Sequence, residues 1–432
     1  MTLGLGGFAV ILLLLGLGVP VAYAIGAVAI AGIYIAVGPV FLLSTVETLP
    51  YAFASDYNFV VVPLFVLMGA LASRAGIISD LYLAAFRLTS TVRGSLMMAT
   101  VMAQAMFAAI SGSTTVSASI FTRMALPEML RFGYNAGVSG GCVAAAGTLA
   151  GLIPPSIAMV LYAVLTGEPI GKLLIAGILP GALTAVGYLI GIRTMLVFKP
   201  DWAPAIQQRF TLGEKLKSIS RTWSVVVLMG LVMGGIYTGW FPPSAAGAVG
   251  AAGVLAIALS MRRIKLGAIW ESLLESARIS AILFLIVMAG LLFSRFLLIS
   301  GFMNDFKSLL LAIDISAALF LGLVVALFLV LGCFVDSVSL MVITLPILYP
   351  ITKELGIDGI WFGVLVIKLI EIAAITPPVG LNLFAVLAAA KGMLQSRALF
   401  LGVVPFLIIE AILLALLFLY PGIATFLPRL MD

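Results

Sequence analysis

Leu152-Ile153-Pro154-Pro155-Ser156 and Ile375-Thr376-Pro377-Pro378-Val379-Gly380-Leu381-Asn382 each place two consecutive prolines inside a long apolar segment. Each pair follows a short polar island in the preceding apolar stretch, at residues 111–115 before the first pair and at residues 332–339 before the second. The two sets lie about 220 residues apart, which is half of the chain. The pattern therefore predicts a duplicated membrane protein with a broken helix in each half, an arrangement typical of membrane transport.

Composition sets the class of protein. Hydrophobic residues make up 63% of the 432 residues and charged residues only 9%, whereas soluble domains are about 25% charged. Apolar stretches of roughly 20 residues recur, each long enough to span about 30 Å of hydrocarbon. No Lys or Arg precedes Arg74, so the N-terminal apolar run is predicted to be a retained helix and not a signal peptide. Because the chain has no His, imidazole metal sites and His-dependent catalysis are excluded, and we expect no enzyme activity.

The distribution of basic residues predicts the orientation in the membrane. We assume that the segments near 95–130 and 314–352 are hairpins that enter and leave on one side. One set of loops, at 74–93, 123–131, 193–221, 262–278 and 391–397, then holds seventeen Lys and Arg, and the other set holds five. The positive-inside rule then places the basic set in the cytoplasm and both termini outside. The net charge of +6 is interpreted as topological, so no nucleic-acid partner is expected. Cys142 and Cys333 are expected to be apolar packing residues, although a disulfide between them is possible.

The expected fold is an all-α polytopic membrane protein made of two inverted repeats. The three parts are a first repeat, a cytoplasmic connector and a second repeat, at residues 1–198, 199–221 and 222–432. Each repeat contains a re-entrant helical hairpin followed by a Pro-Pro-broken helix, expected at about 95–130 and 136–165, and at about 314–352 and 357–390. Simple spanning helices are expected within 3–38 (two), 59–73, 171–198, 222–238, 243–261, 279–299 and 398–420.

The Pro-Pro breaks suggest a chemistry. A proline inside a helix has no amide proton and displaces the carbonyl four residues earlier, so four carbonyls are expected to be released, those of Ala150, Gly151, Ala373 and Ala374. Ile153 and Thr376 precede the proline pairs and are expected to be extended. Freed carbonyls faced by hydroxyl and amide oxygens suit a hard cation such as Na⁺, and the N-terminal ends of the half-helices can face an anion.

Simpler interpretations remain open at this point. A lone Pro-Pro pair in a membrane helix is more often a kink, and Ser and Thr commonly hydrogen-bond neighbouring helices. The duplicated conjunction of polar island and break favours a cation or substrate site. Asp336 is the strongest single candidate, because an intramembrane carboxylate is costly unless it is paired or coordinating; its alternative role is a hairpin-tip cap. Lys368 and Glu371, three residues apart on one helix, are expected to form a structural pair.

Four motifs together resemble a known family. Ser111-Gly112-Ser113, Leu-Pro-Glu-Met at 126–129, Ile-Pro-Pro-Ser at 153–156 and Thr-Pro-Pro-Val-Gly at 376–380 are similar to the DctM-like large membrane subunit of TRAP (tripartite ATP-independent periplasmic) transporters. The resemblance covers essentially the whole chain. It implies a Na⁺-driven elevator-type importer of organic acids in the bacterial inner membrane, with periplasmic termini and no cofactor besides Na⁺. It also implies two partners, a small four-helix membrane subunit and a periplasmic substrate-binding protein.

The resemblance also implies site residues. The first cation site would involve Ser111, Gly112, Ser113, Thr114, Gly147, Gly151, Pro154 and Ser156. The second would involve Asp336, Ser337, Ser339, Thr376, Pro378 and Gly380. Thr115 and Asn382 would contact the substrate. The sequence Ser337-Val338-Ser339 departs from the family pattern of Pro and Thr-like residues after the Asp, which leaves the exact ligands of the second site open.

Two other classes of function compete with this one. A stand-alone Na⁺/carboxylate symporter of related architecture would share the hairpins and breaks but would need no binding protein. A membrane enzyme is disfavoured, because the chain lacks His, a metal-ligand cluster and a nucleotide loop. An assembly scaffold is disfavoured because duplicated broken helices have no obvious purpose in a scaffold. The identity of the carried acid stays open, since in this family the binding protein does much of the selecting.

Overall fold

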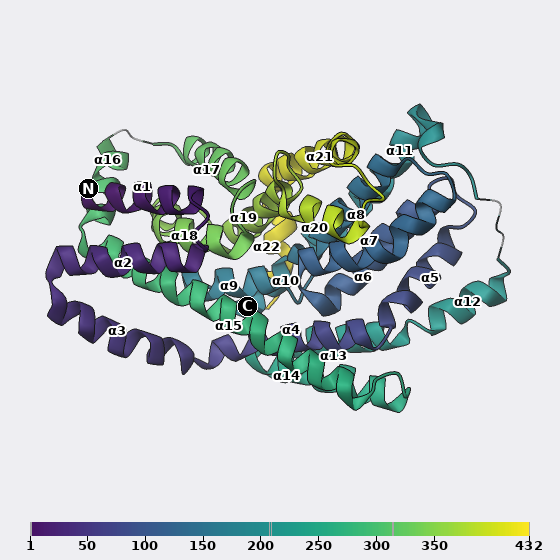
Figure 1. The fold of residues 1–432 in the computed structure, drawn as a ribbon, viewed down its shortest axis with the longest axis horizontal. Helices are drawn as coiled ribbons and strands as arrows, with labels where there is room; N and C mark the ends of the chain where they lie inside the picture. Colours follow the sequence, from purple (N-terminus) through teal and green to yellow (C-terminus); the bar gives the residue numbers. More distant parts are fainter. Residues whose placement is uncertain (1, 207, 209, 313–314, 432) are drawn as a thin grey trace.

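The computed structural model describes residues 2–206, 208, 210–312 and 315–431, and every regular element in these ranges is a helix (Figure 1). The first half comprises α1 Thr2–Gly16, α2 Val21–Val37, α3 Pro39–Ala54, η1 Tyr57–Val60, α4 Val61–Arg74, α5 Ile77–Thr89, α6 Ser95–Ser111, α7 Thr114–Arg131, α8 Ala136–Leu152, α9 Ile157–Thr166, α10 Ile170–Ala176 and α11 Ile178–Phe198. The connector holds η2 Pro200–Trp202 and α12 Leu212–Ser220. The second half comprises α13 Trp223–Tyr237, α14 Pro243–Ser260, α15 Leu266–Ile299, α16 Phe302–Ala312, α17 Ala317–Gly332, α18 Ser337–Glu354, α19 Gly359–Ala374, α20 Leu381–Ala390, α21 Ser396–Leu419 and α22 Gly422–Arg429. The predicted all-α class is confirmed.

Membrane-spanning candidates recur along the described chain. Four segments are long and apolar enough to cross a bilayer, namely Ile170–Phe198 (α10 with α11), Pro243–Ser260, Leu266–Ile299 and Ser396–Leu419. Three helix pairs qualify when each is counted as one bent span: α4 with α5 at 67°, α8 with α9 at 43°, and α12 with α13 at 44°. The chain is thus a polytopic membrane protein.

Helix pairs lie where the two hairpins were predicted, and both predicted broken helices are present; re-entry of the hairpins into the membrane stays a prediction. α6 and α7 form the first hairpin, and α17 and α18 form the second; residue 314, where the second was expected to begin, lies outside the described residues. Each hairpin is followed by a helix that stops at its Pro-Pro pair and restarts after it, as α8–α9 and as α19–α20. The order of elements therefore agrees with the predicted repeats, and the inversion of one repeat relative to the other stays a prediction.

The sequence interpretation was wrong at residues 262–278, which were expected to be a loop. From Leu266 onward they form the first turns of α15, a helix of 34 residues that begins 13 residues before the expected position 279. Glu271 and Glu275 lie one turn apart on it and face Arg74 of α4, with N–O distances of 3.6 Å and 2.6 Å. Charge made this part of the sequence look like a loop, although it is a helix end that pairs with a neighbouring helix.

Three helices had no counterpart in the sequence interpretation. α3 occupies the less apolar segment before Asp56, α12 lies within the connector, and α22 follows the last expected spanning helix. All three combine polar or turn-forming residues with apolar ones. A search for long apolar runs does not detect such helices, because their composition is mixed.

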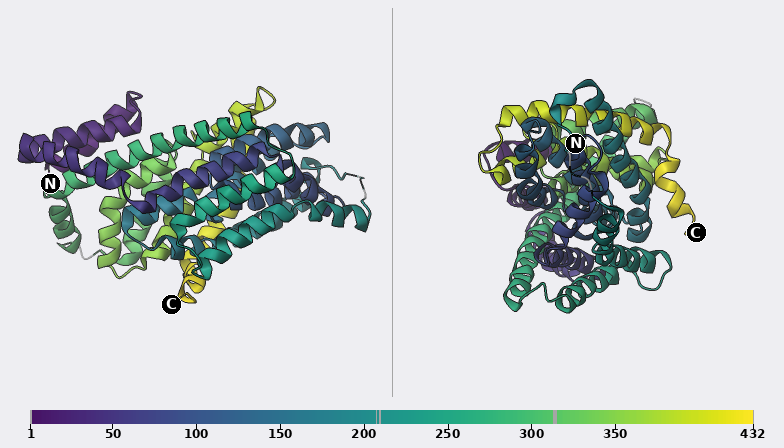
Figure 2. Two further views of the ribbon diagram at one scale, coloured as in Figure 1. Left: turned by 90° about the horizontal axis from the view of Figure 1, so that it is seen from below. Right: turned by 90° about the vertical axis from the view of Figure 1, so that its right-hand side faces the viewer.

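The two broken helices form the centre of the molecule. Every residue of α8 from Gly137 to Leu152 is buried, and α8 packs against α6, α7 and α21. The crossing with α21 is very close, since a Cβ atom on Gly402 would lie 2.0 Å from the carbonyl carbon of Gly137; small residues permit such approach in membrane proteins. A second group of helices, α1, α2, α4, α13, α14 and α15, packs together alongside this core (Figures 1 and 2).

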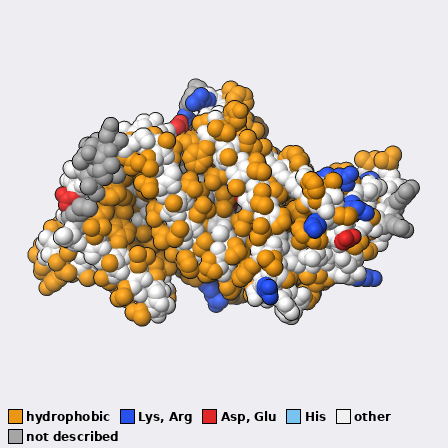
Figure 3. All heavy atoms as spheres, turned by 90° about the horizontal axis from the view of Figure 1, so that it is seen from above, with side chains coloured by type: hydrophobic (Ala, Val, Ile, Leu, Met, Phe, Trp, Pro, Cys, Tyr) orange, Lys and Arg blue, Asp and Glu red, His pale blue; other side chains and the backbone are white. Residues whose placement is uncertain are grey.

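The surface agrees with a membrane environment. The face in Figure 3 is largely apolar, and most of its visible Lys and Arg gather toward the end of the molecule that carries the connector. This is the end that the charge distribution places in the cytoplasm.

We expect Lys215 and Arg262 to face the cytoplasm and Glu168 and Lys353 to face the periplasm, because basic residues concentrate in the first set of loops. The variants Lys215→Cys, Arg262→Cys, Glu168→Cys and Lys353→Cys would be labelled with an impermeant thiol reagent in intact cells. The two native cysteines are buried and would be replaced by Ala. Labelling at 168 and 353 alone is the expected result, and labelling at 215 from outside would refute the orientation.

Candidate functional site

The tip of the first hairpin lies directly against the first Pro-Pro break. Between α6 and α7, Gly112 has φ +59°, in the left-handed region that glycine adopts without steric cost. A Cβ atom on Gly112 would lie 2.6 Å from the carbonyl oxygen of Pro155, so a larger residue would push the tip away from the break. The flanking residues Ser111 and Ser113 are thereby held beside the break.

The first break is buried throughout. Ile153 is extended, with φ −72° and ψ 119°, as predicted, and the peptide bond between Pro154 and Pro155 is cis. Ser156 is the N-cap residue of α9, and its hydroxyl accepts a hydrogen bond from the backbone N–H of Met159 at 3.3 Å. This hydroxyl therefore serves as a helix cap and retains a second lone pair.

The two predicted glycines of α8 face different partners. A Cβ atom on Gly147 would lie 3.2 Å from the carbonyl oxygen of Thr114, so Gly147 belongs with the first hairpin tip. A Cβ atom on Gly151 would lie 2.3 Å from Oε1 of Glu371, which is part of α19. Gly151 thus allows the first broken helix to approach the second.

The second hairpin tip meets the second break in the same way. The backbone N–H of Gly380 donates to the carbonyl oxygen of Cys333 at 3.3 Å. Gly380 has φ +62°, and the peptide bond between Pro377 and Pro378 is cis. This break is more open than the first, since Pro378 is exposed and Thr376 is half-buried.

Asp336 caps the helix that leaves the second tip. Its Oδ1 accepts hydrogen bonds from the backbone N–H groups of Val338 and Ser339, both at 3.1 Å. This is the alternative role considered for this carboxylate. Both bonds end on one oxygen, and Oδ2 receives none from the described residues. A cap and a cation ligand are therefore compatible in the same side chain.

Buried oxygen atoms without a hydrogen-bond partner among the described residues occur at both tips. They are Ser111 Oγ, Ser339 Oγ and Asn382 Oδ1. Such atoms are costly to bury unless something interacts with them. The nearby Thr376 hydroxyl donates to the carbonyl of Ile372 at 2.6 Å, which leaves its lone pairs available. Hydroxyl, amide and carboxylate oxygens form a donor set that fits a hard cation such as Na⁺.

A cavity of about 520 Å³ opens beside the first tip, between the hairpin and helices α4 and α15. Its polar lining comprises Ser73, Arg74, Ser111, Ser113, Thr115, Ser119, Arg123 and Glu275. Glu275 engages Arg74, whereas Arg123 is exposed and forms no ion pair with a described residue. Thr115, one of the two predicted substrate residues, thus faces a cavity that contains positive charge.

Asn382, the other predicted substrate residue, does not line this cavity. It is buried at the start of α20, and its Nδ2 donates to the carbonyl oxygen of Ala144 in α8 at 3.4 Å. The two predicted substrate residues therefore do not meet in one cavity in this conformation.

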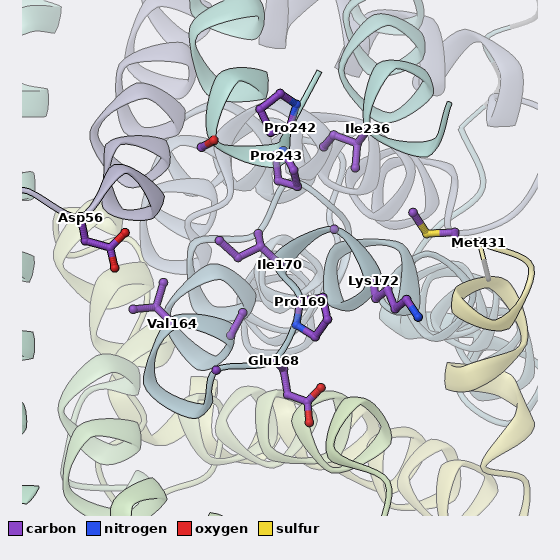
Figure 4. Close-up of a pocket in the computed structure, with 14 residues that line it drawn as sticks. Asp56, Val164, Glu168, Pro169, Ile170, Lys172, Ile236, Pro242, Pro243 and Met431 are labelled. Carbon is purple, nitrogen blue, oxygen red and sulfur yellow. The ribbon is translucent and has the colours of Figure 1, made fainter. Parts of the chain in front are cut away.

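A second cavity, of about 540 Å³, lies between the α9–α10 turn and the start of α14 (Figure 4). Its charged lining residues are Asp56, Glu168 and Lys172, and none of the predicted site residues lines it. Glu168 is engaged by Lys353 at 2.7 Å and by the hydroxyl of Tyr349. This cavity is therefore separate from the predicted cation sites.

A group of charged side chains is fully enclosed near the breaks. The predicted pair is present, with Lys368 Nζ 4.0 Å from Glu371 Oε2, but Glu410 Oε2 of α21 is closer at 2.6 Å. Lys368 also donates to the Thr184 hydroxyl at 3.0 Å, and the Tyr188 hydroxyl donates to Glu410. Sequence reasoning missed Glu410, because it lies 42 residues from Lys368 on another helix. The available signal was a lone acidic residue within the last apolar span.

Comparison with known proteins decides the family. Residues 8–423 match the model of the DctM component of tripartite ATP-independent periplasmic transporters. The chain belongs to this family. A DctM large permease for C4-dicarboxylates from Pseudomonas aeruginosa is 35% identical over 87% of both chains. The ectoine large permease TeaC from Halomonas elongata is 28% identical over 96% of both.

Two further comparisons place the DctM chain among its relatives. The sialic acid permease SiaT from Haemophilus influenzae is 30% identical over 89% of this chain and 62% of its own length. Among solved structures, the YdaH transporter from Alcanivorax borkumensis aligns with a TM-score of 0.64 and 14% identity, covering 89% of this chain and 90% of that one. The latter likeness concerns the fold.

Membership of the DctM family settles several broader points. The protein is the large permease component of a TRAP transporter, an integral protein of the inner membrane. TRAP large permeases work with a small membrane subunit and a periplasmic binding protein. They are transport proteins and not enzymes.

Proposed function

We propose that this chain is the translocating subunit of a Na⁺-coupled system that takes up an organic acid delivered by a periplasmic binding protein. The observation that supports it most is the contact of each polar hairpin tip with a Pro-Pro break. Buried oxygen atoms without a partner among the described residues belong to each tip, at Ser111 and Ser339. In secondary transporters, unwound backbone carbonyls at such breaks coordinate Na⁺.

The proposed cation ligands follow from this geometry. At the first tip, Ser111 to Thr114 would act with Gly147 and with the break at Pro154 and Ser156. At the second tip, the ligands would come from Asp336, Ser337, Ser339, Thr376, Pro378 and Gly380. Gly151 faces Glu371, and like the other glycines it would contribute its backbone carbonyl. No other cofactor is proposed.

The cavity beside the first tip supports an anionic substrate. Arg74 in its lining is engaged by Glu275 and by Glu271, so Arg123 supplies the positive charge that is available to a ligand. Arg123 projects from the hairpin, whereas Arg74 and Glu275 come from α4 and α15. A carboxylate bound near Thr115 would thus lie between the hairpin and the neighbouring helices, and Asn382 would need to reach the substrate in another conformation.

The names of the relatives suggest which acid to test first. The relative from Pseudomonas aeruginosa is named for C4-dicarboxylates and two others for sialic acid and ectoine. A C4-dicarboxylate such as succinate is therefore the first substrate to test. An elevator mechanism is part of the proposal: the core around α8 and α19 would move against the group of α1, α2, α4 and α13–α15.

We expect uptake in liposomes to require a Na⁺ gradient, the small membrane subunit and the binding protein, and to be unaffected by ATP. The physical reason for the membrane partner is that α1–α3 and α13 expose large apolar side chains, for example Leu13, Tyr34 and Val226 at 63%, 54% and 60%, and provide a thin scaffold. Radiolabelled acid would be measured inside liposomes as each component is omitted. Full transport by this chain alone would favour the stand-alone symporter instead.

A further inference from the structure

The connector carries a short helix whose features fit a lipid surface. In α12, Leu212, Leu216 and Ile219 follow helical spacing and expose 79%, 66% and 42% of their surface. Positions i, i+4 and i+7 lie on one face of a helix. Trp223, at the start of the membrane-spanning helix α13, is 45% exposed. The apolar stripe therefore leads directly into a segment that enters the bilayer.

The other faces of α12 are basic or attached to the protein. Lys215 lies beside the stripe, whereas Lys217 and the C-cap residue Arg221 lie on the other side of the helix and are exposed. Glu214 is the one acidic residue of the helix, and its carboxylate completes a capping box with Thr211. The polar side of the helix thus carries three cations, while its acidic group is used at the helix start.

α12 is attached to α5 on a different side from the stripe. The Arg87 guanidinium of α5 donates to the Ser218 hydroxyl at 2.7 Å, and Ser218 is buried. Phe210, just before α12, packs edge-on against Phe86 at 5.9 Å and lies under Arg87 at 5.4 Å. These contacts fix the rotation of α12 about its own axis. Since α5 covers another face of α12, the apolar stripe stays exposed.

We propose that α12 is an interfacial anchor that lies on the cytoplasmic leaflet, with Leu212, Leu216 and Ile219 among the acyl chains and Lys215, Lys217 and Arg221 on anionic lipid headgroups. Charge complementarity supports this occupant, since cytoplasmic leaflets carry anionic lipids that attract basic residues beside a membrane helix. Continuity with α13 supports it too, because only two residues separate the helices and the 44° bend turns α12 away from the direction of α13. In the proposed arrangement α13 crosses the bilayer, and α12, counted above with it as one bent span, meets the leaflet obliquely. Amphipathic helices of this composition bind in the interface plane.

The anchor would act on the connector between the two halves of the chain. By holding α12 and, through Arg87 and Ser218, also α5, the leaflet would fix the cytoplasmic end of α13 in depth. This role is independent of the proposed substrate and coupling ion, and it depends on the predicted cytoplasmic position of residue 215.

The test uses spin labels on the full chain reconstituted in vesicles. Leu216→Cys and Lys217→Cys would be labelled in a background in which the two buried native cysteines are Ala. Collision with oxygen, which concentrates in the bilayer, would be compared with collision with a water-soluble nickel chelate. In vesicles of phosphatidylcholine with phosphatidylglycerol, we expect a severalfold higher oxygen-to-nickel ratio at 216 than at 217. The ratio at 216 should fall in phosphatidylcholine alone and in the variant Lys215→Gln/Lys217→Gln/Arg221→Gln.

Each other outcome overturns the proposal. Equal nickel access at 216 and 217 would place the stripe in water. Protection of 216 from both reagents would show that a protein surface covers it. The oxygen-to-nickel ratio at 216 could stay high in phosphatidylcholine alone and in the triple variant. That result would show that the stripe contacts the bilayer through apolar contact only, and it would refute recognition of anionic headgroups. Far-UV circular dichroism of each variant verifies that the helical fold is retained.

Discussion

The double variant Glu371→Gln/Glu410→Gln is expected to lose about 3–5 kcal/mol of unfolding free energy, the usual cost of leaving a buried charge without its partner. Lys368 is fully buried and has two carboxylates near it, at 2.6 Å and 4.0 Å. Either single change leaves one carboxylate to balance the ammonium. The double change leaves only the Thr184 hydroxyl, which cannot neutralise the charge. We therefore expect the two single losses to sum to less than the double loss.

The measurement is reversible unfolding of the purified protein in mixed micelles, followed by circular dichroism. Adding Lys368→Met to the double variant should restore most of the stability, because it removes the unpaired charge while the amide introduced at position 410 can still accept from Tyr188. Glu271→Gln is the matched control, since its ion pair spans 3.6 Å and its side chain is 68% exposed; exposed pairs contribute less than about 1 kcal/mol. A double variant as stable as the parent protein would show that Lys368 is not held as a charged group by these carboxylates.

The fold was predictable from the sequence where local chemistry determined it. The proline pairs stop a helix wherever they occur, and Gly112 and Asp336 mark turns by their own conformational preferences. The hairpins, the breaks and the extended conformation of Ile153 followed from these residues alone. The predicted helix boundaries were wrong where a charged residue pairs with a distant part of the chain. Glu275 is an example, because its partner Arg74 is 201 residues away.

The site was predictable only in part, because a local stretch of sequence does not determine which helices contact one another. The duplicated pattern of polar island and Pro-Pro pair suggested that each hairpin tip would contact its own break. No pattern in the sequence suggested the contact of Gly151 with Glu371. Glu410 escaped notice for the same reason. The separation of Thr115 from Asn382 depends on the conformation of the whole molecule, which no local pattern encodes.

Ser113→Ala and Asp336→Asn are expected to reduce Na⁺-driven uptake at least about tenfold, the equivalent of about 1.4 kcal/mol of lost cation binding. Asn caps helices as well as Asp does, so Asp336→Asn retains an acceptor for the amides of Val338 and Ser339 and removes only the charge. Asp336→Ala removes both and should be no more active. The matched controls are Thr122→Ala and Thr344→Ala on the same hairpins, whose hydroxyls donate to carbonyls one turn earlier at 2.7 Å.

The most direct test of coupling at the hairpin tips is the initial rate of acid uptake by Asp336→Asn over a Na⁺ titration, with the partner proteins present. Coupling through this carboxylate predicts that Thr344→Ala follows the parent curve, whereas Asp336→Asn needs far more Na⁺ or shows no Na⁺-dependent uptake, at equal amounts of folded protein in the membrane. An Asp336→Asn curve that coincides with the parent curve would show that Asp336 is a helix cap alone and would contradict a cation site at the second tip.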